Sequence, residues 1–234
     1  MNWEVMFENI PQLLRGTWLS LELVALSLIA GGIIAVPMAL MRVSRNPVVR
    51  IVPLAYTFFF RGTPLLVQLF LFYYGLAQFE SVRESAFWPV LREAYWCALI
   101  VFALNTGAYT AEILRGAIQA VPKGEIEAAL SAGMGRVLML RRVVLPRAYR
   151  IALPAYGNEI ILMLKGSALA STITLLDLTG MARTVIAKTY MPVEIFFMAG
   201  VIYLLLTFLF VQGFHRLEKR ALRFERPRST APVR

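Results

Sequence analysis

Polar side chains recur at helical spacing inside apolar stretches of this sequence. Asn105, Tyr109 and Glu112 follow one another at steps of four and three, so they share one face of a helix. Tyr156 and Glu159 lie three residues apart in a later stretch, and Glu159 stands about midway along it. Lipid offers such groups no hydrogen-bond partner, so we expect them to face the interior of a helix bundle or an aqueous path. Buried structural hydrogen bonding is the alternative for each of them.

A second set of polar residues surrounds Arg61. Thr57, Arg61, Pro64 and Gln68 are spaced four, three and four apart, which predicts a common helical face. An arginine within apolar sequence is costly unless it faces protein, water or the headgroup region. Two interpretations stay open: the Arg61 side chain extends to the cytoplasmic headgroups, or it lies inside the bundle.

The elements that hold these residues are predicted to be transmembrane helices. Of the 234 residues, 59% are hydrophobic and 16% are charged, whereas a soluble domain carries about 25% charged residues. The sequence therefore predicts a single all-α integral membrane domain, residues 1–234, that ends in a disordered basic tail at about 226–234. In the first span, Ser27, Gly31 and Ala35 recur every four residues, which favours close helix packing. The five predicted spans are residues 16–41, 53–76, 95–115, 149–169 and 195–214.

Positive charge is concentrated after alternate spans. Most Lys and Arg residues lie in the stretches 42–50, 115–150 and 216–234, and few lie in the loops between them. Loops rich in Lys and Arg remain in the cytoplasm, so we expect the N-terminus outside and the C-terminus in the cytoplasm. This asymmetry also accounts for the formal net charge of +10 without a nucleic-acid partner.

Cysteine and histidine are almost absent, which excludes several kinds of site. The single Cys97 cannot form an internal disulfide, and the single His215 cannot build a metal site. No Ser or Cys nucleophile has a base beside it in the sequence, so we predict no catalytic residues and disfavour a membrane enzyme. The chain also contains no G-x-x-x-x-G-K-[ST] loop that could bind ATP.

The segment 121–146, between the third and fourth spans, is predicted to form a helix–turn–helix on the cytoplasmic side. Pro122 ends the preceding helix, and Glu127 lies in the first turn of a new one, where an acidic side chain stabilises the positive helix end. Gly133 ends this helix, because glycine suits a left-handed cap. Residues 137–144 are predicted to form a second short helix before the next span.

This segment resembles the EAA signature of ABC-importer permeases. Val143 replaces the usual isoleucine, and the other positions of the signature stand at its spacing. The residues that carry the resemblance are Glu127-Ala128-Ala129, Gly133 and Val143-x-Leu145-Pro146.

Further blocks resemble one branch of these permeases and bring nearly the whole chain into the resemblance. Arg61–Gln68 and Tyr109–Ile113, with Arg115-Gly116 after it, look like blocks of the polar amino-acid permeases. Asn105-Thr106, Ala152–Leu164 and Ala168–Thr172 are most similar to the histidine/lysine-arginine-ornithine branch.

The resemblance implies the fold of a type I ABC-importer permease with five transmembrane helices. In that family the EAA segment is a coupling helix that docks in a groove of an ATPase. Ala128 and Ala129 would permit close docking, Glu127 would supply a charged contact or cap, and Gly133 would form the turn. ATP and Mg²⁺ would be bound by the partner ATPase, and the permease itself would bind no cofactor or metal.

The same resemblance implies a set of partners. Permeases of this family work as dimers, of like or unlike chains, in the bacterial cytoplasmic (inner) membrane. Two ATP-binding subunits and a periplasmic amino-acid-binding protein complete the importer. Closure of the ATPases on ATP would open the helix bundle outward, which is alternating access around a site near the bilayer midplane.

The resemblance further implies that the substrates are basic amino acids, namely histidine, arginine, lysine and ornithine. A cationic side chain needs a carboxylate partner, and Glu159 fits that need. The other substrate-binding candidates are Asn105, Tyr109, Tyr156 and Gln68.

Two alternatives remain. A permease for neutral or acidic polar amino acids, of the glutamine or glutamate type, shares most of these motifs. An ion channel or proton-coupled transporter could use Glu159 but has no need of an ATPase-contacting segment.

The roles of two basic residues stay open. Arg61 could bind a substrate carboxylate. Lys165 lies about 120° around the helix from Glu159 and has no assigned role.

Overall fold

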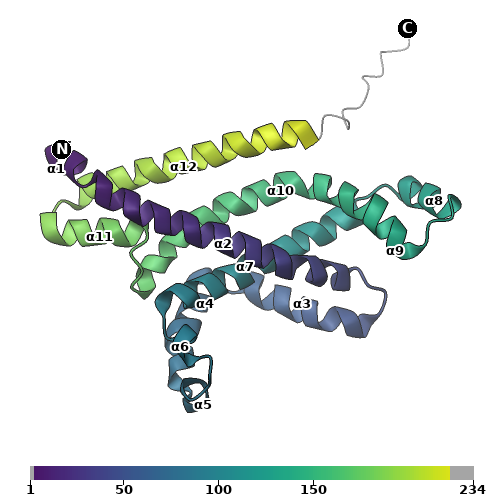
Figure 1. The fold of residues 1–234 in the computed structure, drawn as a ribbon, viewed down its shortest axis with the longest axis horizontal. Coiled ribbons are helices and arrows are strands. Elements are labelled where there is room, and N and C mark those ends of the chain that lie inside the picture. The colour runs from purple at the N-terminus through teal and green to yellow at the C-terminus, as the bar shows by residue number, and fades with distance from the viewer. Residues whose placement is uncertain (1–2, 222–234) are drawn as a thin grey trace, which may run out of the picture.

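A computed structural model describes residues 3–221 of the chain, and within that range it contains helices and no strands. The longest helices of this part run along the length of the molecule (Figure 1). They are α2 (Ile10–Arg42), α7 (Ala94–Gln119), α10 (Leu145–Gly166) and α12 (Pro192–Ala221), and a short α1 (Trp3–Glu8) precedes them. The predicted disordered tail, residues 226–234, lies outside the described residues.

The described helices account for up to five membrane spans. Three of them, α2, α7 and α12, are individually long and apolar enough to cross a membrane. Two bent pairs raise the number to five when each pair counts as one span. One pair, Pro47–Gly62 with Leu65–Gln78, is bent by 106°, and the other, Arg136–Ile173 with Leu178–Thr189, is bent by 48°. The predicted all-α membrane fold is confirmed, with two of its spans broken.

Small residues allow α2 and α7 to pack closely. Ser27, Gly31 and Ala35 are all buried on α2, as their spacing predicts. A Cβ atom on Gly31 would lie 2.5 Å from Thr106 Cγ2 and 2.8 Å from the backbone oxygen of Ala103 on α7. Since only glycine fits at this point, α2 touches the backbone of α7 directly.

The second predicted span is wrong as a continuous helix. α3 (Pro47–Gly62) ends just before Pro64, and α4 (Leu65–Phe70) then starts in a new direction. α4 continues through a π-helical turn, η1 (Leu71–Gly75), and a 3-10 turn, η2 (Leu76–Gln78). This region therefore holds two helical segments where hydropathy predicts one.

The Thr63-Pro64 pair causes the break. Pro64 has no N–H to donate to the helix before it, and its ring favours an extended conformation at Thr63, where φ is −114° and ψ is 144°. The predicted common face that runs from Thr57 through Arg61 to Gln68 is therefore wrong. The first two residues lie on α3 and Gln68 lies on α4, beyond the bend.

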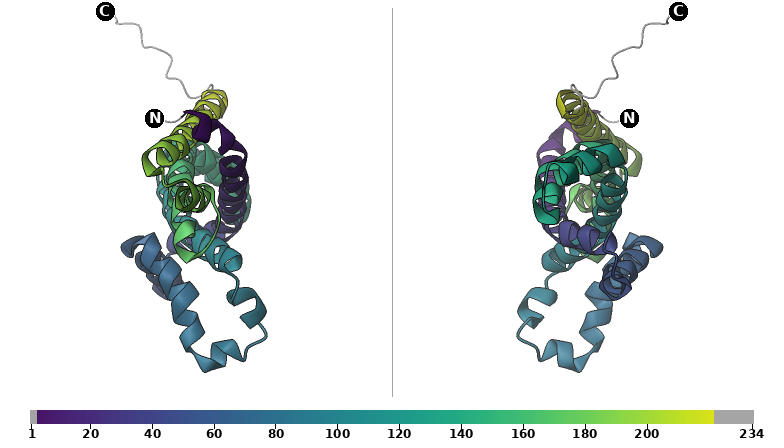
Figure 2. Two further views of the ribbon diagram at one scale, coloured as in Figure 1. Left: turned by 90° about the vertical axis from the view of Figure 1, so that its left-hand side faces the viewer. Right: turned by 90° about the vertical axis from the view of Figure 1, so that its right-hand side faces the viewer.

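Beyond the break α4 packs against α7, with Gln68 and Leu69 buried, and the following residues 71–93 project to one side as an arm (Figure 2). The arm carries α5 (Glu80–Arg83) and α6 (Trp88–Leu91) before the chain returns into α7. Exposed aromatic side chains on it are Tyr74, Phe79 and Phe87. The molecule thus has a lateral apolar surface that a straight span would not provide.

A buried cap fixes α11 (Leu178–Thr189) to α2. The Asp177 side chain is fully buried and accepts a hydrogen bond from the backbone N–H of Gly180 at 3.1 Å. Ser20 Oγ of α2 accepts a hydrogen bond from the backbone N–H of Leu178 at 3.1 Å. These bonds satisfy N–H groups at the start of α11 that would otherwise be buried without partners.

The segment 121–146 lies at the opposite end of the molecule from α11 (Figure 1). α8 (Lys123–Ser131) ends near Gly133, whose φ of +73° confirms the predicted left-handed turn. Glu127 lies in the second turn of α8 and not in the first, because the helix already begins directly after Pro122.

The second short helix predicted over 137–144 is not a separate element. α9 (Arg136–Met139) passes through a π-helical turn, η3 (Leu140–Val144), directly into α10. A 3-10 turn, η4 (Ser167–Ile173), prolongs α10 at its other end. The widened π turn precedes Pro146, which lacks an N–H for the α-helical ladder, so the helix continues past the proline instead of starting at it.

Candidate functional site

Glu159 is a buried carboxylate in α10, with 5% of the residue exposed. Within residues 3–221, no Lys, Arg or His forms an ion pair with it. Thr106 of α7 faces the carboxylate, although its hydroxyl makes no hydrogen bond of ordinary geometry. A carboxylate buried in this way in a membrane bundle lacks a compensating cation.

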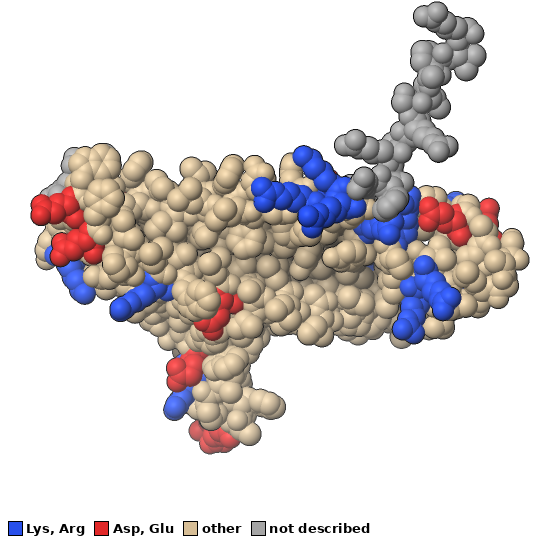
Figure 3. Space-filling model, turned by 45° about the horizontal axis from the view of Figure 1, so that its top comes forward, with Lys and Arg blue, Asp and Glu red and all other residues tan. Residues whose placement is uncertain are grey.

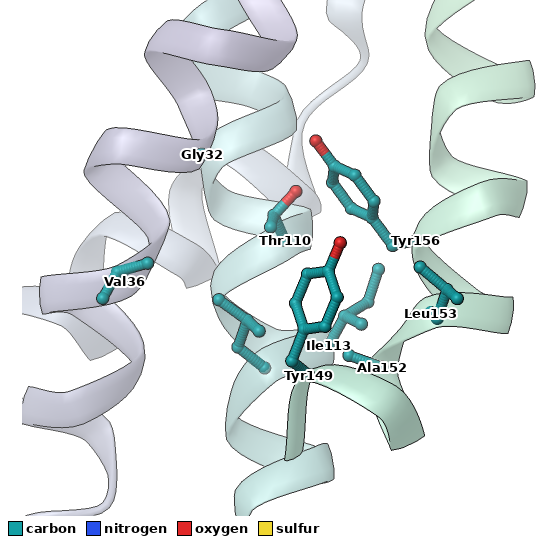
Figure 4. A pocket seen from close by; sticks show the side chains of 9 residues that line it. Gly32, Val36, Thr110, Ile113, Tyr149, Ala152, Leu153 and Tyr156 are labelled. Atoms are coloured by element: carbon teal, nitrogen blue, oxygen red, sulfur yellow. The ribbon is translucent and has the colours of Figure 1, made fainter. Parts of the chain in front are cut away.

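A pocket of about 300 Å³ lies between α2, α7 and α10 (Figure 4). Tyr156, one turn before Glu159, is part of its wall. The hydroxyl groups of Tyr149, Tyr156 and Thr110 all lie toward the same end of the pocket (Figure 4). The remaining wall is apolar apart from backbone and comprises Gly32, Val36, Ile113, Leu114, Ala152 and Leu153. Hydroxyl groups and an apolar wall therefore adjoin the helix face that carries Glu159.

Gln68 and Asn105, both predicted to bind substrate, contact each other at the break between α3 and α4. Gln68 Nε2 donates to the backbone carbonyls of Phe60 at 2.8 Å and Thr63 at 3.0 Å. Asn105 Nδ2 donates to the Phe60 carbonyl at 3.2 Å and to Gln68 Oε1 at 3.0 Å. The two amides thus satisfy carbonyls that the break at Pro64 leaves without helical donors. Their role in substrate binding stays a prediction.

Glu112 is held by arginines. Arg42 Nε donates to Glu112 Oε1 at 2.9 Å, and Arg115 Nε donates to Glu112 Oε2 at 2.8 Å. Arg61 Nη1 lies 3.8 Å from Oε2, and the Arg61 guanidinium carbon lies 5.3 Å from the centroid of the Tyr109 ring. Glu112 therefore joins α2, α3 and α7, and Tyr109 supports the third arginine.

Sequence reasoning missed Arg42 and Arg115 as partners of Glu112. The contact with Arg115 has a local signal, because the two residues are spaced i, i+3 on one helix. Arg42 precedes Glu112 by 70 residues, and no local pattern indicates that contact. Lys165 is exposed, and within the described part of the chain it forms no ion pair with Glu159.

The predicted coupling residues on α8 differ in their exposure to solvent. Glu127 and Ala128 are exposed, whereas Ala129 is buried against its own chain. Arg147 Nε of α10 lies 3.3 Å from Glu125 Oε1, which ties α8 to the base of α10. Large apolar side chains are also exposed here, namely Leu130, Val137 and Leu138. An exposed helix with small and apolar side chains has the character of a docking element.

The charged side chains of the described residues are distributed unevenly. Figure 3 shows Lys and Arg side chains gathered at the end that holds α8 and the C-terminal part of α12. In the part of the chain that the structure describes, no group of three or more His, Cys, Asp or Glu side chains could hold a metal ion. The orientation of this end in the membrane stays a prediction.

Comparison of the sequence with known proteins gives transport permeases throughout. Residues 27–223 match the family described as "Binding-protein-dependent transport system inner membrane component". The chain is 50% identical to the octopine transport system permease protein OccM of Rhizobium meliloti, over 97% of this chain and 93% of that protein. It is 49% identical to the nopaline transport system permease protein NocM of Agrobacterium fabrum (strain C58 / ATCC 33970), over 89% and 87%. It is 44% identical to the histidine/lysine/arginine/ornithine transport system permease protein HisM of Escherichia coli (strain K12), over 92% and 91%.

Solved structures share the arrangement of helices. An amino acid ABC transporter crystallised with histidines has a chain 35% identical to this one, with a TM-score of 0.85 over 94% of this chain and 99% of that chain. The MetNI methionine ABC transporter, in an inward-facing conformation, has a chain only 18% identical, with a TM-score of 0.77 over 92% and 98%. The second likeness concerns the fold alone, and both agree with the predicted permease fold.

Proposed function

Because the chain belongs to the family of binding-protein-dependent transport system inner membrane components, we propose that it is the permease subunit of an ATP-driven importer for cationic amino acids and arginine conjugates. The family consists of membrane-spanning transport subunits, so this chain moves the substrate and is not an enzyme. The proposal specifies what the family alone leaves open, namely the charge of the substrate and the residue that recognises it.

The unpaired carboxylate of Glu159 carries the proposal. Ionisation inside a low-dielectric bundle is costly unless a cation compensates it. No described side chain makes that compensating contact, and Tyr156 on the same helix face lines a pocket beside it. A cationic group of the substrate would pair with this carboxylate, and Tyr156 and Tyr109 would lie near the bound substrate.

The names of the relatives support a cationic substrate. Histidine, lysine, arginine and ornithine are basic amino acids, and octopine and nopaline are conjugates of arginine that keep its guanidinium. One carboxylate at the position of Glu159 would therefore serve every compound in this set. A permease of the glutamine or glutamate type would gain nothing from an uncompensated carboxylate in its bundle.

The coupling proposal rests on α8. Glu127, Ala128 and Gly133 would form the docking surface and turn that engage the ATPase, while Ala129 packs inward and positions the helix. ATP and Mg²⁺ would be bound by that ATPase. The importer would further comprise a second permease chain and a periplasmic binding protein. Membership of a family of binding-protein-dependent inner membrane components supports the binding protein as a partner and the bacterial inner membrane as the location.

The proposed orientation puts α8 and the C-terminus in the cytoplasm and the N-terminus outside. The gathering of Lys and Arg at the α8 end supports it. In this orientation, α8 faces the compartment that holds ATP. Closure of the ATPases would then pull on α8 and rock the bundle between outward-facing and inward-facing states.

The substitution Glu159→Gln tests the proposed function. The change keeps the shape of the side chain and one acceptor but removes its charge. Arginine uptake should therefore fall about 10- to 150-fold, the factor that corresponds to the free energy of one hydrogen bond to a charged group. Uptake of citrulline, the neutral analogue of arginine, should fall much less. Both are measured per unit of permease assembled with its ATPase. An equal loss for the two compounds, or no loss, would assign Glu159 to the scaffold.

A further inference from the structure

Three arginines surround Glu112, and two of them are hydrogen-bonded to its carboxylate. Each oxygen of Glu112 already accepts a hydrogen bond from a charged donor, Oε1 from Arg42 at 2.9 Å and Oε2 from Arg115 at 2.8 Å. Arg61 approaches Oε2 only to 3.8 Å, which is beyond hydrogen-bond distance. The Glu112 side chain is 10% exposed, so the cluster forms largely out of water and retains an excess of positive charge.

Arg61 presents this excess charge to an open pocket. Its side chain is 44% exposed and donates no hydrogen bond to any described residue. The guanidinium carbon lies 5.3 Å from the centroid of the Tyr109 ring, so the ring supports the guanidinium through its face. The pocket has a volume of about 280 Å³ and is lined by Arg42, Leu54, Thr57, Phe58, Arg61, Gly62 and Glu112. An oxyanion that enters this pocket would meet the Arg61 guanidinium.

Arg61 and Glu159 both lie against α7: Arg61 packs on Tyr109, and Glu159 faces Thr106, three residues earlier on the same helix. The two side chains come from α3 and α10 and form no ion pair with each other. A cation and a carboxylate are thus held in the same region without neutralising each other. An amino acid with a cationic side chain has the complementary arrangement, because its α-carboxylate and its cationic group are separated by the aliphatic chain.

We infer that Arg61 binds the carboxylate of the transported substrate while Glu159 binds its cationic group. The inference rests on the proposed function and adds a second recognition point to it. A planar guanidinium can hold a carboxylate through two parallel N–H···O bonds, which gives orientation as well as affinity. Lipid phosphate is an oxyanion with similar chemistry, and the response to an anionic lipid distinguishes it from the substrate carboxylate.

The test compares arginine with agmatine, which is arginine without its carboxylate. Both are titrated by calorimetry into the permease–ATPase complex in nanodiscs of neutral phosphatidylcholine. In the unaltered complex arginine should bind more tightly than agmatine. Arg61→Gln should weaken arginine binding about 10- to 150-fold, the value of a hydrogen bond between charged groups, and should leave agmatine binding unchanged. Arg61→Lys keeps the charge and the contact with Glu112 but loses the planar fork, so it should weaken arginine binding selectively by a smaller factor.

Two matched variants separate the possible roles. Arg115→Gln removes a guanidinium that is already bonded to Glu112 and Gln119, so it should change arginine and agmatine binding equally. Glu159→Gln should weaken both ligands, because both carry the guanidinium.

Specific results would overturn the inference. Equal losses for the two ligands in the Arg61 variants would assign Arg61 to the structure of the Glu112 cluster, and unchanged binding would remove it from the site. A defect that appears only as a lost response to added phosphatidylglycerol would make lipid phosphate the occupant. If the unaltered complex binds neither ligand, the proposed function itself fails. If Glu159→Gln weakens both arginine and agmatine but the unaltered complex binds the two ligands equally well, only this inference fails.

Discussion

The side chain of Gln68 donates a hydrogen bond to the backbone carbonyl of Phe60, 2.8 Å away and eight residues earlier in the chain. In an unbroken helix that carbonyl would accept from the N–H of residue 64, which is proline. The Gln68 amide therefore takes the place of a missing backbone donor. A polar side chain can thus be required in an apolar span because of the backbone alone.

Gln68→Met should destabilise the protein. The change keeps the volume but leaves the buried carbonyls of Phe60 and Thr63 with fewer donors, at a cost of about 1–3 kcal/mol. The thermal unfolding midpoint of the purified complex should fall. Gln78→Met is the matched control, since Gln78 is exposed and its amide makes only a long 3.4 Å bond to Tyr74 within the described chain.

A second change distinguishes the structural role from a role in substrate binding. Pro64→Ala restores an N–H at the break, so it should recover part of the stability lost in Gln68→Met. A Gln68→Met protein that is fully stable but loses arginine uptake would instead support Gln68 as a substrate-binding residue.

Gly31→Ala should separate α2 from α7. The new methyl group would lie 2.5 Å from Thr106 Cγ2 and 2.8 Å from the Ala103 carbonyl, and such overpacking costs about 1–3 kcal/mol. Gly32→Ala is the control next to it, because a Cβ there meets nothing within 4 Å. Thermal stability of the two variants in detergent is the measurement. Equal stability would show that α2 shifts to accommodate the methyl group.

Gly133→Val should uncouple transport from ATP hydrolysis. Gly133 has a φ of +73°, which a β-branched residue resists, although its Cβ would meet no other atom. The turn after α8 should therefore change while the spans still insert. Gly135→Val is the control, because Gly135 has a φ of −66°. ATPase stimulation by the loaded binding protein should be lost in the first variant and kept in the second; normal stimulation in both would remove α8 from the coupling role.

The proposed orientation can be tested with single cysteines. Cys97 is buried and its Sγ lies 2.9 Å from the Leu91 carbonyl, so Cys97→Ala supplies a background free of native thiols. In that background, a membrane-impermeant maleimide should label Ser81→Cys on intact cells and label Ser131→Cys only after permeabilisation. Labelling after permeabilisation controls for accessibility, and the reverse pattern would invert the topology.

Hydropathy predicts which stretches form apolar helices but not where those helices break. A mean over about 19 residues has the same value for a straight span and a bent one. The Thr63-Pro64 pair did carry a local signal, since the residue before a proline avoids the helical conformation. The chain's apolar composition outweighed that signal, and the periodicity argument then placed Gln68 on the wrong face.

The candidate site was predictable only in its local parts. The burial of Glu159 follows from its place in an apolar stretch, and the structure confirms it. The contact of Asn105 with Gln68 depends on the break, and the contact of Arg42 with Glu112 joins residues 70 apart. Such contacts are set by helix packing, so no spacing in the sequence predicts them.

The chain is helical without interruption from Arg136 to Ile173. Its path of 38 residues, at about 1.5 Å per residue, is about 57 Å long, which exceeds the thickness of the bilayer core. One end adjoins α8 and the other adjoins the bend that leads into α11, with Glu159 between them. The segment is curved, and a π turn and Pro154 lie within it (Figure 1). A single continuous helical segment therefore joins α8 to the helix that carries Glu159, so a displacement of α8 can reach that residue without crossing a loop.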